Sequence, residues 1–204
     1  SDRTLYALSN ERKIYSVATT GALAAVRTLD TPLNGTTQYT LDFNPLIPTG
    51  SMQNRLRLIG SDRSNAVVNV EDGVVTTNTA VSGSPMPEVK AAAYLNNFRG
   101  STITSLLVID RANSALSVQN ISDTVAIQGT LTRLSALGIT LDPLSPVGFD
   151  ASGRNNENQL LMARTSSSGN FSLYRVNSAV NSNPLTLIDA IASSSEFIDI
   201  AIRF

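Results

Sequence analysis

The sequence predicts an all-β fold, a small β-propeller with four four-stranded blades in a single domain over residues 1–204. Three observations predict it. Short apolar runs bounded by Gly, Pro, Asn and Ser follow one another along the chain, and helical periodicity is nearly absent. A unit of roughly fifty residues recurs four times, which is the period of propeller blades. The last apolar run of the chain also supplies the strand that the first unit lacks.

The repeat is clearest in two strands that each unit places one after the other. Four apolar runs start 51, 50 and 54 residues apart, at Leu5–Leu8, Leu56–Ile59, Leu106–Ile109 and Leu160–Ala163. Each is followed by a polar turn and a second run, at Ile14–Val17, Val67–Val70, Leu116–Gln119 and Leu173–Val176. Two strands joined by a short polar turn are typical of a hairpin, so every unit is expected to be built on one.

An outer and an inner strand complete each unit. The outer strand is expected near Leu23–Leu29, Val74–Val81, Val125–Leu131 and Leu185–Ile191. Inner strands precede three units, at Tyr39–Phe43, Val89–Leu95 and Pro146–Asp150, and small residues in them suit strands that converge near an axis. The first unit has no such strand before it.

The missing strand is found at the other end of the chain, at Phe197–Phe204. We therefore expect the ring to be closed by the C-terminal strand joining the N-terminal blade, since closure protects sheet edges. The four expected blades comprise residues 197–204 plus 4–30, 39–82, 89–134 and 146–192.

Several motifs resemble a bacterial family of unknown function, number 4394, in the same order and over nearly the whole chain. They are Leu5–Leu8 with Ile14-Tyr15, Leu41–Pro45, Arg55–Arg57, Ala91–Asn96 and Val147–Asp150. The resemblance implies exported bacterial proteins with a propeller-like fold, and it implies no catalytic residues. Typical members carry one more blade-like segment before the Asp42-Phe43-Asn44-Pro45 motif, so five blades remain an alternative to four.

Composition narrows the class of partner. The chain is 42% hydrophobic and only 15% charged, and 25 Ser, 20 Thr and 18 Asn take the place of charges. Its net charge is −1, with no run of like charges, which argues against nucleic acid or an anionic membrane surface as partner. No apolar stretch is long enough to insert into a membrane.

The absence of Cys and His from the sequence removes cysteine nucleophiles, thiolate metal sites, the commonest general base and the commonest zinc ligand. The chain begins at Ser1 without an apolar leader, which we interpret as a mature form after removal of an export signal. We therefore expect no enzyme activity and a secreted, extracellular or cell-surface location.

The candidate site residues are three aspartates on the expected inner strands, Asp42, Asp150 and Asp199. Carboxylates that converge on a propeller axis could hold Ca²⁺ or Mg²⁺ through oxygen ligands. The more ordinary alternative is that each caps a turn or pairs with an Arg of a neighbouring strand. No other cofactor is expected.

Two repeated segments, Asp62–Asn65 and Asp110–Asn113, are interpreted as hairpin turns rather than ligand sites, because Asp and Asn bond their own backbone. Glu71-Asp72-Gly73 is interpreted in the same way.

The leading functional expectation is an exported, non-enzymatic structural or interaction module of a bacterial cell surface or extracellular matrix. Its partners would be other proteins or further copies of itself in a homopolymer, because exposed edge strands pair readily. One alternative is a propeller that binds an ion or a small ligand at its axis. A minor alternative is a carbohydrate-active enzyme that uses the carboxylate pair Asp42 and Asp150.

Overall fold

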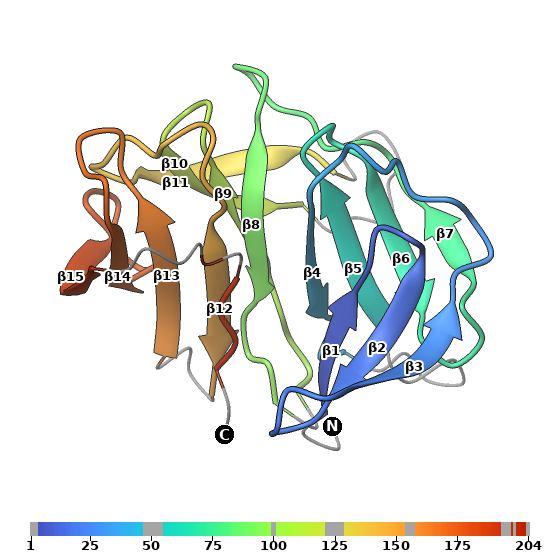
Figure 1. The fold of residues 1–204 in the computed structure, drawn as a ribbon. Helices are drawn as coiled ribbons and strands as arrows, with labels where there is room; N and C mark the ends of the chain where they lie inside the picture. Colours follow the sequence, from blue (N-terminus) through green and yellow to red (C-terminus); the bar gives the residue numbers. More distant parts are fainter. Residues whose placement is uncertain are drawn as a thin grey trace.

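The strands form four antiparallel sheets arranged in a ring, which makes the chain a four-bladed β-propeller (Figure 1). The computed structural model describes residues 4–46, 55–98, 101–120, 129–153, 158–192, 197 and 199–202. Over these ranges every regular element is a strand, and none of them contains a helix that could cross a membrane. The all-β fold class and the count of four blades are thereby confirmed.

Three blades have four described strands and the N-terminal blade has three. Blade 1 consists of β1 (Leu5–Leu8), β2 (Lys13–Val17) and β3 (Leu23–Thr28). Blade 2 consists of β4 (Tyr39–Phe43), β5 (Arg55–Gly60), β6 (Asn65–Asn69) and β7 (Val75–Thr77). Blade 3 consists of β8 (Val89–Tyr94), β9 (Leu106–Asp110), β10 (Ala115–Gln119) and β11 (Leu131–Ala136). Blade 4 consists of β12 (Gly148–Ser152), β13 (Asn158–Arg164), β14 (Phe171–Val176) and β15 (Leu185–Ile191).

The polar segments inside the repeats are hairpin turns, as expected. Arg63 has a φ of 71°, in the left-handed region, and the carboxylate of Asp62 accepts a hydrogen bond from the N–H of Ser64 at 3.0 Å. The turn at Asp72 works in the same way, with Gly73 at a φ of 83° and the N–H of Val74 donating to Asp72 at 2.9 Å. Asp62 and Asp72 therefore stabilise the backbone of their own turns.

The outer strand of blade 3 differs from the expectation. It is β11, Leu131–Ala136, rather than a strand at Val125–Leu131, part of which lies outside the described residues. The connection after β10 is longer here than in the other blades, so spacing alone placed the strand too early. Blade 3 accordingly extends two residues beyond the expected limit of 134.

A shared irregularity shows that the outer strands of blades 1, 3 and 4 are equivalent. Each bulges at its fourth residue, because Val26, Leu134 and Ile188 are skipped in the pairing with the neighbouring strand. The short β7 of blade 2 pairs without a bulge.

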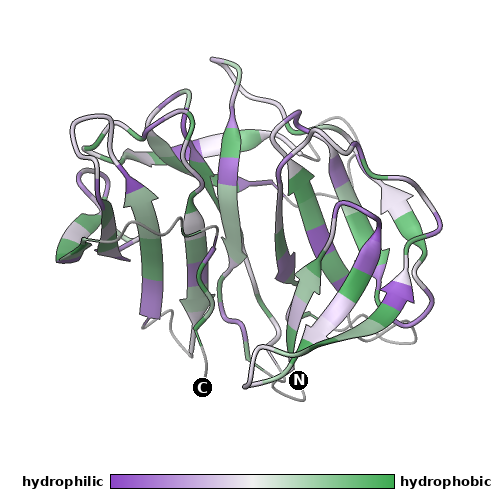
Figure 2. Ribbon diagram, in the orientation of Figure 1, coloured by the Kyte–Doolittle hydropathy of each residue, from purple (hydrophilic) through white to green (hydrophobic). Residues whose placement is uncertain are grey.

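The buried apolar side chains lie mainly between blades. One cluster joins blades 1 and 2 around Ile14 and Leu58, and a second joins blades 2 and 3 around Ile59 and Tyr94. The largest joins blades 3 and 4. Figure 2 shows hydrophobic residues along strands of all four sheets, which fits blades that bury both of their faces. Burial between blades therefore accounts for the ring.

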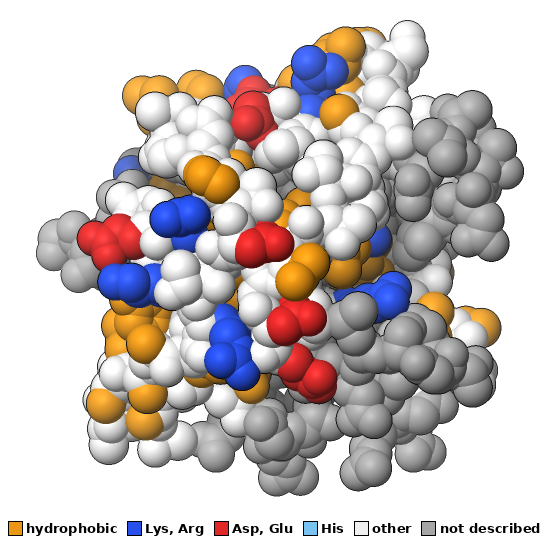
Figure 3. Space-filling view, turned by 90° about the vertical axis from the view of Figure 1, so that its right-hand side faces the viewer, with side chains coloured by type: hydrophobic (Ala, Val, Ile, Leu, Met, Phe, Trp, Pro, Cys, Tyr) orange, Lys and Arg blue, Asp and Glu red, His pale blue; other side chains and the backbone are white. Residues whose placement is uncertain are grey.

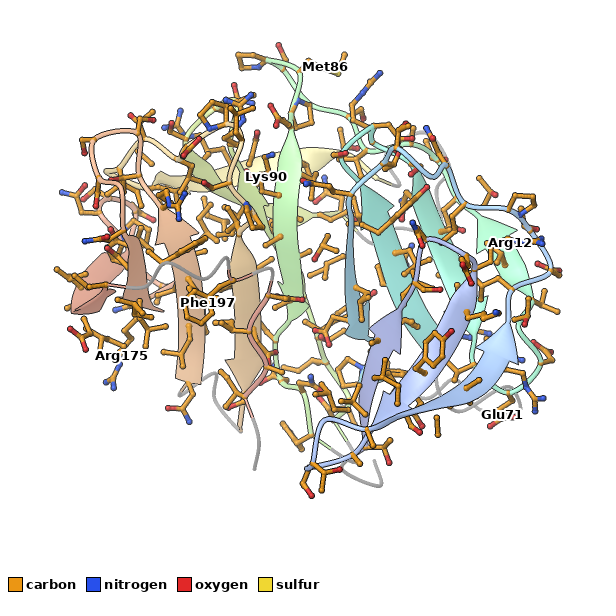
Figure 4. The ribbon with its side chains drawn as sticks, in the orientation of Figure 1. Arg12, Glu71, Met86, Lys90, Arg175 and Phe197 are labelled. Carbon is orange, nitrogen blue, oxygen red and sulfur yellow. The ribbon has the colours of Figure 1, made fainter. Side chains whose placement is uncertain are left out.

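The C-terminal residues lie beside β12, on the side away from β13 (Figure 1). The ring of Phe197 packs edge-on against that of Phe171 in blade 4, with centroids 5.5 Å apart (Figure 4). Residues 199–202 are not assigned to a strand, and among the described residues they have no ladder with β1. Residues 199–202 lie beside the inner strand of blade 4, which is where the inner strand of blade 1 is expected in a closed ring.

Candidate functional site

The candidate site is the set of inner strands, where Asp42 ties two blades together. One carboxylate oxygen of Asp42, on β4, accepts the N–H of Tyr94 on β8 at 2.6 Å. Two residues earlier on the same strand, the hydroxyl of Thr40 accepts the N–H of Ala92 at 2.9 Å. Side chains of blade 2 thus satisfy backbone donors at the edge of blade 3, as an edge strand requires.

Asp150 makes the same kind of contact between β12 and the C-terminal segment. Its Oδ2 accepts the N–H of Ile202 at 2.6 Å. The position corresponding to Thr40 is Gly148, where an added Cβ would lie 2.6 Å from the backbone nitrogen of Ile200. Glycine is therefore required for the close approach of the two backbones. Asp42 and Asp150 each reach a residue 52 positions further along the chain, so the two contacts are one repeated device.

The three predicted site residues influence one another electrostatically. Burial raises the pKa of Asp42 to about 8, and the charge of Asp150, and more weakly that of Asp199, adds to the rise. The pKa of Asp199 is raised to about 6, first by burial and then by the charge of Asp150. Burial also raises the pKa of Asp150. Each of the three carboxyls therefore holds its proton more tightly than in water.

The inner carboxyls are occupied by backbone donors. Asp42 accepts two N–H groups, from Phe43 and Tyr94, and Asp150 likewise accepts two, from Ala151 and Ile202. Within the described ranges no group of three or more acidic side chains is placed to hold a metal ion. The axial Ca²⁺ or Mg²⁺ site stays a prediction. The hydrogen bonds described for Asp42 and Asp150 go to backbone N–H groups of strands and of the C-terminal segment, which is neither the turn capping nor the Arg pairing that the ordinary alternative named.

Arg57 completes the junction between blades 2 and 3, and sequence reasoning did not single it out as a functional residue. It lies opposite Asp42 in the β4–β5 register and is only 8% exposed. Its Nε donates to the phenol oxygen of Tyr94 at 3.2 Å and its Nη1 to the amide oxygen of Asn65 at 2.8 Å. Tyr94 is thus bonded by blade 2 at its backbone and at its hydroxyl. This role depends on the contact of Arg57 with Tyr94, 37 residues further along the chain, which only the folded structure reveals.

A second candidate surface is formed by outer strands β3 and β15, which lie far apart on the molecule (Figure 1). Leu23 of β3 is 60% exposed, and Leu187 and Ile188 of β15 are 57% and 48% exposed. β3 carries one charged residue, Arg27, and β15 carries one, Asp189. Apolar side chains on an unpaired sheet edge are typical of a site that pairs with another chain.

The other two outer strands are less open. β7 has only three residues, and both flanks of β11 are bridged to neighbouring segments, Thr130 to Ser82 and Ala136 to Ser182. Short or covered edges resist pairing. The end of β3 is covered as well, because the N–H of Asp30 donates to the backbone oxygen of Gly73 at 3.0 Å and Nε of Arg27 donates to that of Glu71 at 2.6 Å. Over the described ranges, the most open edge is therefore that of β15 in blade 4.

Figure 3 shows the face that carries the blade 1 and blade 2 side of the ring. Basic and acidic side chains are interspersed there among neutral polar groups, and hydrophobic groups form separate small patches. The described residues of this face present no concentrated field of one sign, which is the feature that a polyanion would need.

The family model described as "Domain of unknown function (DUF4394)" matches residues 1–201. No curated protein matches the chain. Among solved structures, a protein from Lactobacillus plantarum is similar over 96% of this chain and 56% of its own, with 14% identity and a TM-score of 0.44. The computationally designed Ika8 protein is similar over 100% of this chain and 51% of its own, with 12% identity and a TM-score of 0.39. The chain thus spans little more than half the length of either structure.

Proposed function

This chain belongs to the DUF4394 family, whose description assigns no activity, and on that premise we propose that it is a non-enzymatic structural or interaction module. It acts at a bacterial cell surface or in the extracellular matrix after export. It binds protein partners by adding their strands to its open outer edges. The observation that carries the proposal is the exposed apolar edge of β15, in which five successive residues, 186–190, are exposed.

Edge pairing supplies both affinity and specificity. An unpaired strand offers a row of backbone N–H and C=O groups, and the flanking side chains select the partner. In β15 those side chains are Leu187 and Ile188, which lose water-exposed apolar surface when a strand is added. A near-neutral net charge of −1 does not oppose the association.

The experiment compares the purified domain with a Leu187→Lys/Ile188→Lys variant. Both side chains are exposed, so the variant keeps its fold, and lysine on an edge opposes strand addition. The control is Leu144→Lys, which replaces an 88% exposed leucine outside the strands. Each immobilised protein is tested for capture of proteins from the extracellular fraction of the producing bacterium, and each captured protein is purified and rebound.

We expect rebinding to the original domain and to the Leu144→Lys control, and its loss in the β15 variant. Equal rebinding to all three proteins would show that β15 is not the binding surface. Failure of every purified protein, including the chain itself, to rebind would contradict the proposal.

Binding of an ion at the axis is a second candidate, favoured by the mutual effect of Asp42, Asp150 and Asp199 on their pKa values. A divalent cation would relieve the repulsion among these carboxylates once they ionise. This candidate predicts a Ca²⁺-dependent rise in melting temperature that grows with pH.

A further inference from the structure

We infer that Asn34 is a site of self-modification, at which the backbone nitrogen of Gly35 and a water molecule convert the side-chain amide to a carboxylate. The sequence contains a single Asn-Gly pair, and it lies in the crossing between blades 1 and 2, residues 29–38, which joins β3 to β4. The new carboxylate faces Asp62 of blade 2, so the conversion weakens the attachment of the crossing to that blade.

The backbone nitrogen of Gly35 is free to attack the side chain that precedes it. Asn34, Gly35 and Thr36 are all exposed, and a Cβ added at Gly35 would have nothing within 4 Å. Within the described part of the chain, the N–H of Gly35 makes no hydrogen bond. Glycine has no Cβ that would shield the nitrogen. Attack on the neighbouring side chain is intramolecular, and proximity favours such reactions.

Two donors of Thr36 polarise the amide that is attacked. Oδ1 of Asn34 accepts the backbone N–H of Thr36 at 3.2 Å and its hydroxyl at 2.9 Å. Negative charge develops on this oxygen when Gly35 adds to Cγ, and donors aimed at such an oxygen stabilise it. The same two bonds fold the side chain of Asn34 over the backbone that follows it, where Gly35 lies.

The reaction balances with water as its co-reactant. A bond forms between the nitrogen of Gly35 and Cγ of Asn34, the bond from Cγ to Nδ2 breaks, and the proton of the Gly35 nitrogen leaves with the ammonia. Water then opens the cyclic imide at either carbonyl, and its hydroxyl goes to the carbon while its proton goes to the nitrogen. The products are an aspartate at position 34 and its isomer isoaspartate, in which the backbone continues through the side-chain carbonyl.

The turn at Asn113-Ser114 is an internal comparison in which the attacking nitrogen is occupied. The N–H of Ser114 donates to the backbone oxygen of Arg111 at 3.0 Å. The amide of Asn113 also lies beside a carboxylate, because its Nδ2 donates to Asp110 at 2.6 Å. A nitrogen that donates a hydrogen bond must give it up before it can attack, and this costs free energy. Asn113 should therefore persist while Asn34 is converted.

Asp62 couples the conversion to the fold. Its Oδ2 accepts a hydrogen bond from Nδ2 of Asn34 at 3.5 Å and one from the hydroxyl of Thr37 at 2.8 Å, and both bonds attach the crossing to the β5–β6 hairpin. Asp62 is exposed, and a carboxyl in water is ionised at neutral pH. Conversion replaces the donor Nδ2 by a carboxylate oxygen, so two like charges then face each other. The crossing loses one attachment and is repelled from the hairpin.

The first test follows the purified protein as it ages in mildly alkaline buffer, with peptide mapping by mass spectrometry. The matched variant is Gly35→Ala, whose added Cβ lies in open space and leaves the fold intact. We expect aspartate and isoaspartate to accumulate at position 34 of the wild type, while Asn113 stays intact. Gly35→Ala should slow the conversion about tenfold, because its Cβ hinders the approach of the nitrogen to Cγ.

The second test measures the effect on the fold by thermal unfolding at low salt. Asn34→Asp supplies the charged product directly and should lower the melting temperature by about 2–4 °C. High salt should reduce this difference, since exposed charges are screened. In an Asp62→Asn background the same change should cause no such fall, because the amide keeps an acceptor for Thr37 and Ser64 but carries no charge. Ageing of the wild type should move its melting temperature in the same direction.

Conversion at Asn34 that is no faster than at Asn113, or that is equally fast in Gly35→Ala, overturns the self-modification. An Asn34→Asp variant that melts with the wild type at low salt, or that is destabilised equally in the Asp62→Asn background, overturns the coupling to blade 2. Circular dichroism checks that each variant is folded. If Gly35→Ala is not, Asn34→Gln replaces it, because its longer side chain cannot form the same ring with the nitrogen of Gly35.

Discussion

At the scale of single residues, aspartate has one recurrent role in this fold. Asp42, Asp150, Asp189 and Asp199 each accept the N–H of the residue that follows, at 2.7–2.8 Å. The first three lie on the edge strands β4, β12 and β15, and Asp199 lies in the C-terminal segment beside β12. A carboxylate that covers an outward N–H removes one donor of an edge from pairing; in β15 that donor is the N–H of Ala190, while Leu187 and Ile188 stay exposed. Where a second blade lies close, as at Asp42 and Asp150, the other oxygen ties the blades together.

Arg57 provides the sharpest test at this scale. Arg57→Ala removes the donors to Tyr94 and Asn65 and leaves both acceptors buried, so we expect the free energy of unfolding to fall by about 3 kcal/mol. Arg133→Ala, at an exposed position, should change it by less than about 0.5 kcal/mol. Urea unfolding of both variants measures the difference. Equal stability would mean that the Arg57 bonds do not hold the two blades.

At the scale of elements, the hairpins and inner strands could be predicted because their signals are local. In β3, β11 and β15 the leucine that opens the outer strand, followed three residues later by the bulged residue, as in Leu185 and Ile188, is also visible in the sequence. The position of β11 was missed because a longer connection separates it from β10. The repeat also assigned Asp42 and Asp150 to equivalent inner-strand positions, from which each accepts a backbone N–H 52 residues further along the chain.

Other features of the site could not be predicted because they depend on contacts between blades. The register of β4 against β8 determines that Asp42 bonds Tyr94, and no pattern within either strand encodes it. The burial of Arg57 is also tertiary, since the corresponding positions are apolar in the other blades: Leu107 in blade 3, and in blade 4 Leu160, which lies opposite Asp150 as Arg57 lies opposite Asp42.

The C-terminal segment is the element whose packing depends most on a single residue, Gly148. In Gly148→Ala the new Cβ would meet the backbone of Ile200 and Asp199, which cannot move aside by changing a side-chain rotamer. We expect a loss of about 1–3 kcal/mol in the free energy of unfolding and faster proteolysis of the C-terminus. Gly35→Ala, where nothing lies within 4 Å of the added atom, is the matched control. If both variants are as stable as the wild type, the segment is not held against β12.

At the scale of the whole molecule, the C-terminal segment decides whether the ring behaves as one unit. Its removal exposes the edge of β12, leaves Oδ2 of Asp150 without the N–H of Ile202, and uncovers the ring of Phe171. We therefore expect a chain that lacks residues 197–204 to lose its single cooperative transition in calorimetry, rather than to lose only a tail. An unchanged melting temperature would show that the other three blade interfaces suffice.

The pH dependence of stability also belongs to the whole molecule, because it sums over the inner strands. The pKa of Asp42 is raised to about 8 and that of Asp199 to about 6, while an unfolded aspartate titrates near 3.8. The folded state therefore binds more protons than the unfolded state between about pH 4 and pH 8, and stability falls as pH rises through this window. Below about pH 4 the opposite effect acts, since hydrogen bonds lower the pKa of Asp62 and Glu88 and this stabilisation is lost as pH falls. The melting temperature should be highest near pH 4.

Replacement of Asp42 by Asn separates these contributions and tests the axial ion at the same time. The amide oxygen keeps an acceptor for Tyr94 but carries no charge, so Asp42→Asn should flatten the fall in melting temperature between pH 5 and pH 8. If Ca²⁺ or Mg²⁺ binds at the axis, it should raise the melting temperature of the wild type at pH 8, where the carboxyls ionise, more than at pH 5, and it should have little effect on the variant. A cation effect that is the same at both pH values, or absent, would leave the three aspartates with the role that their bonds display, which is to cap and join the edges of the blades.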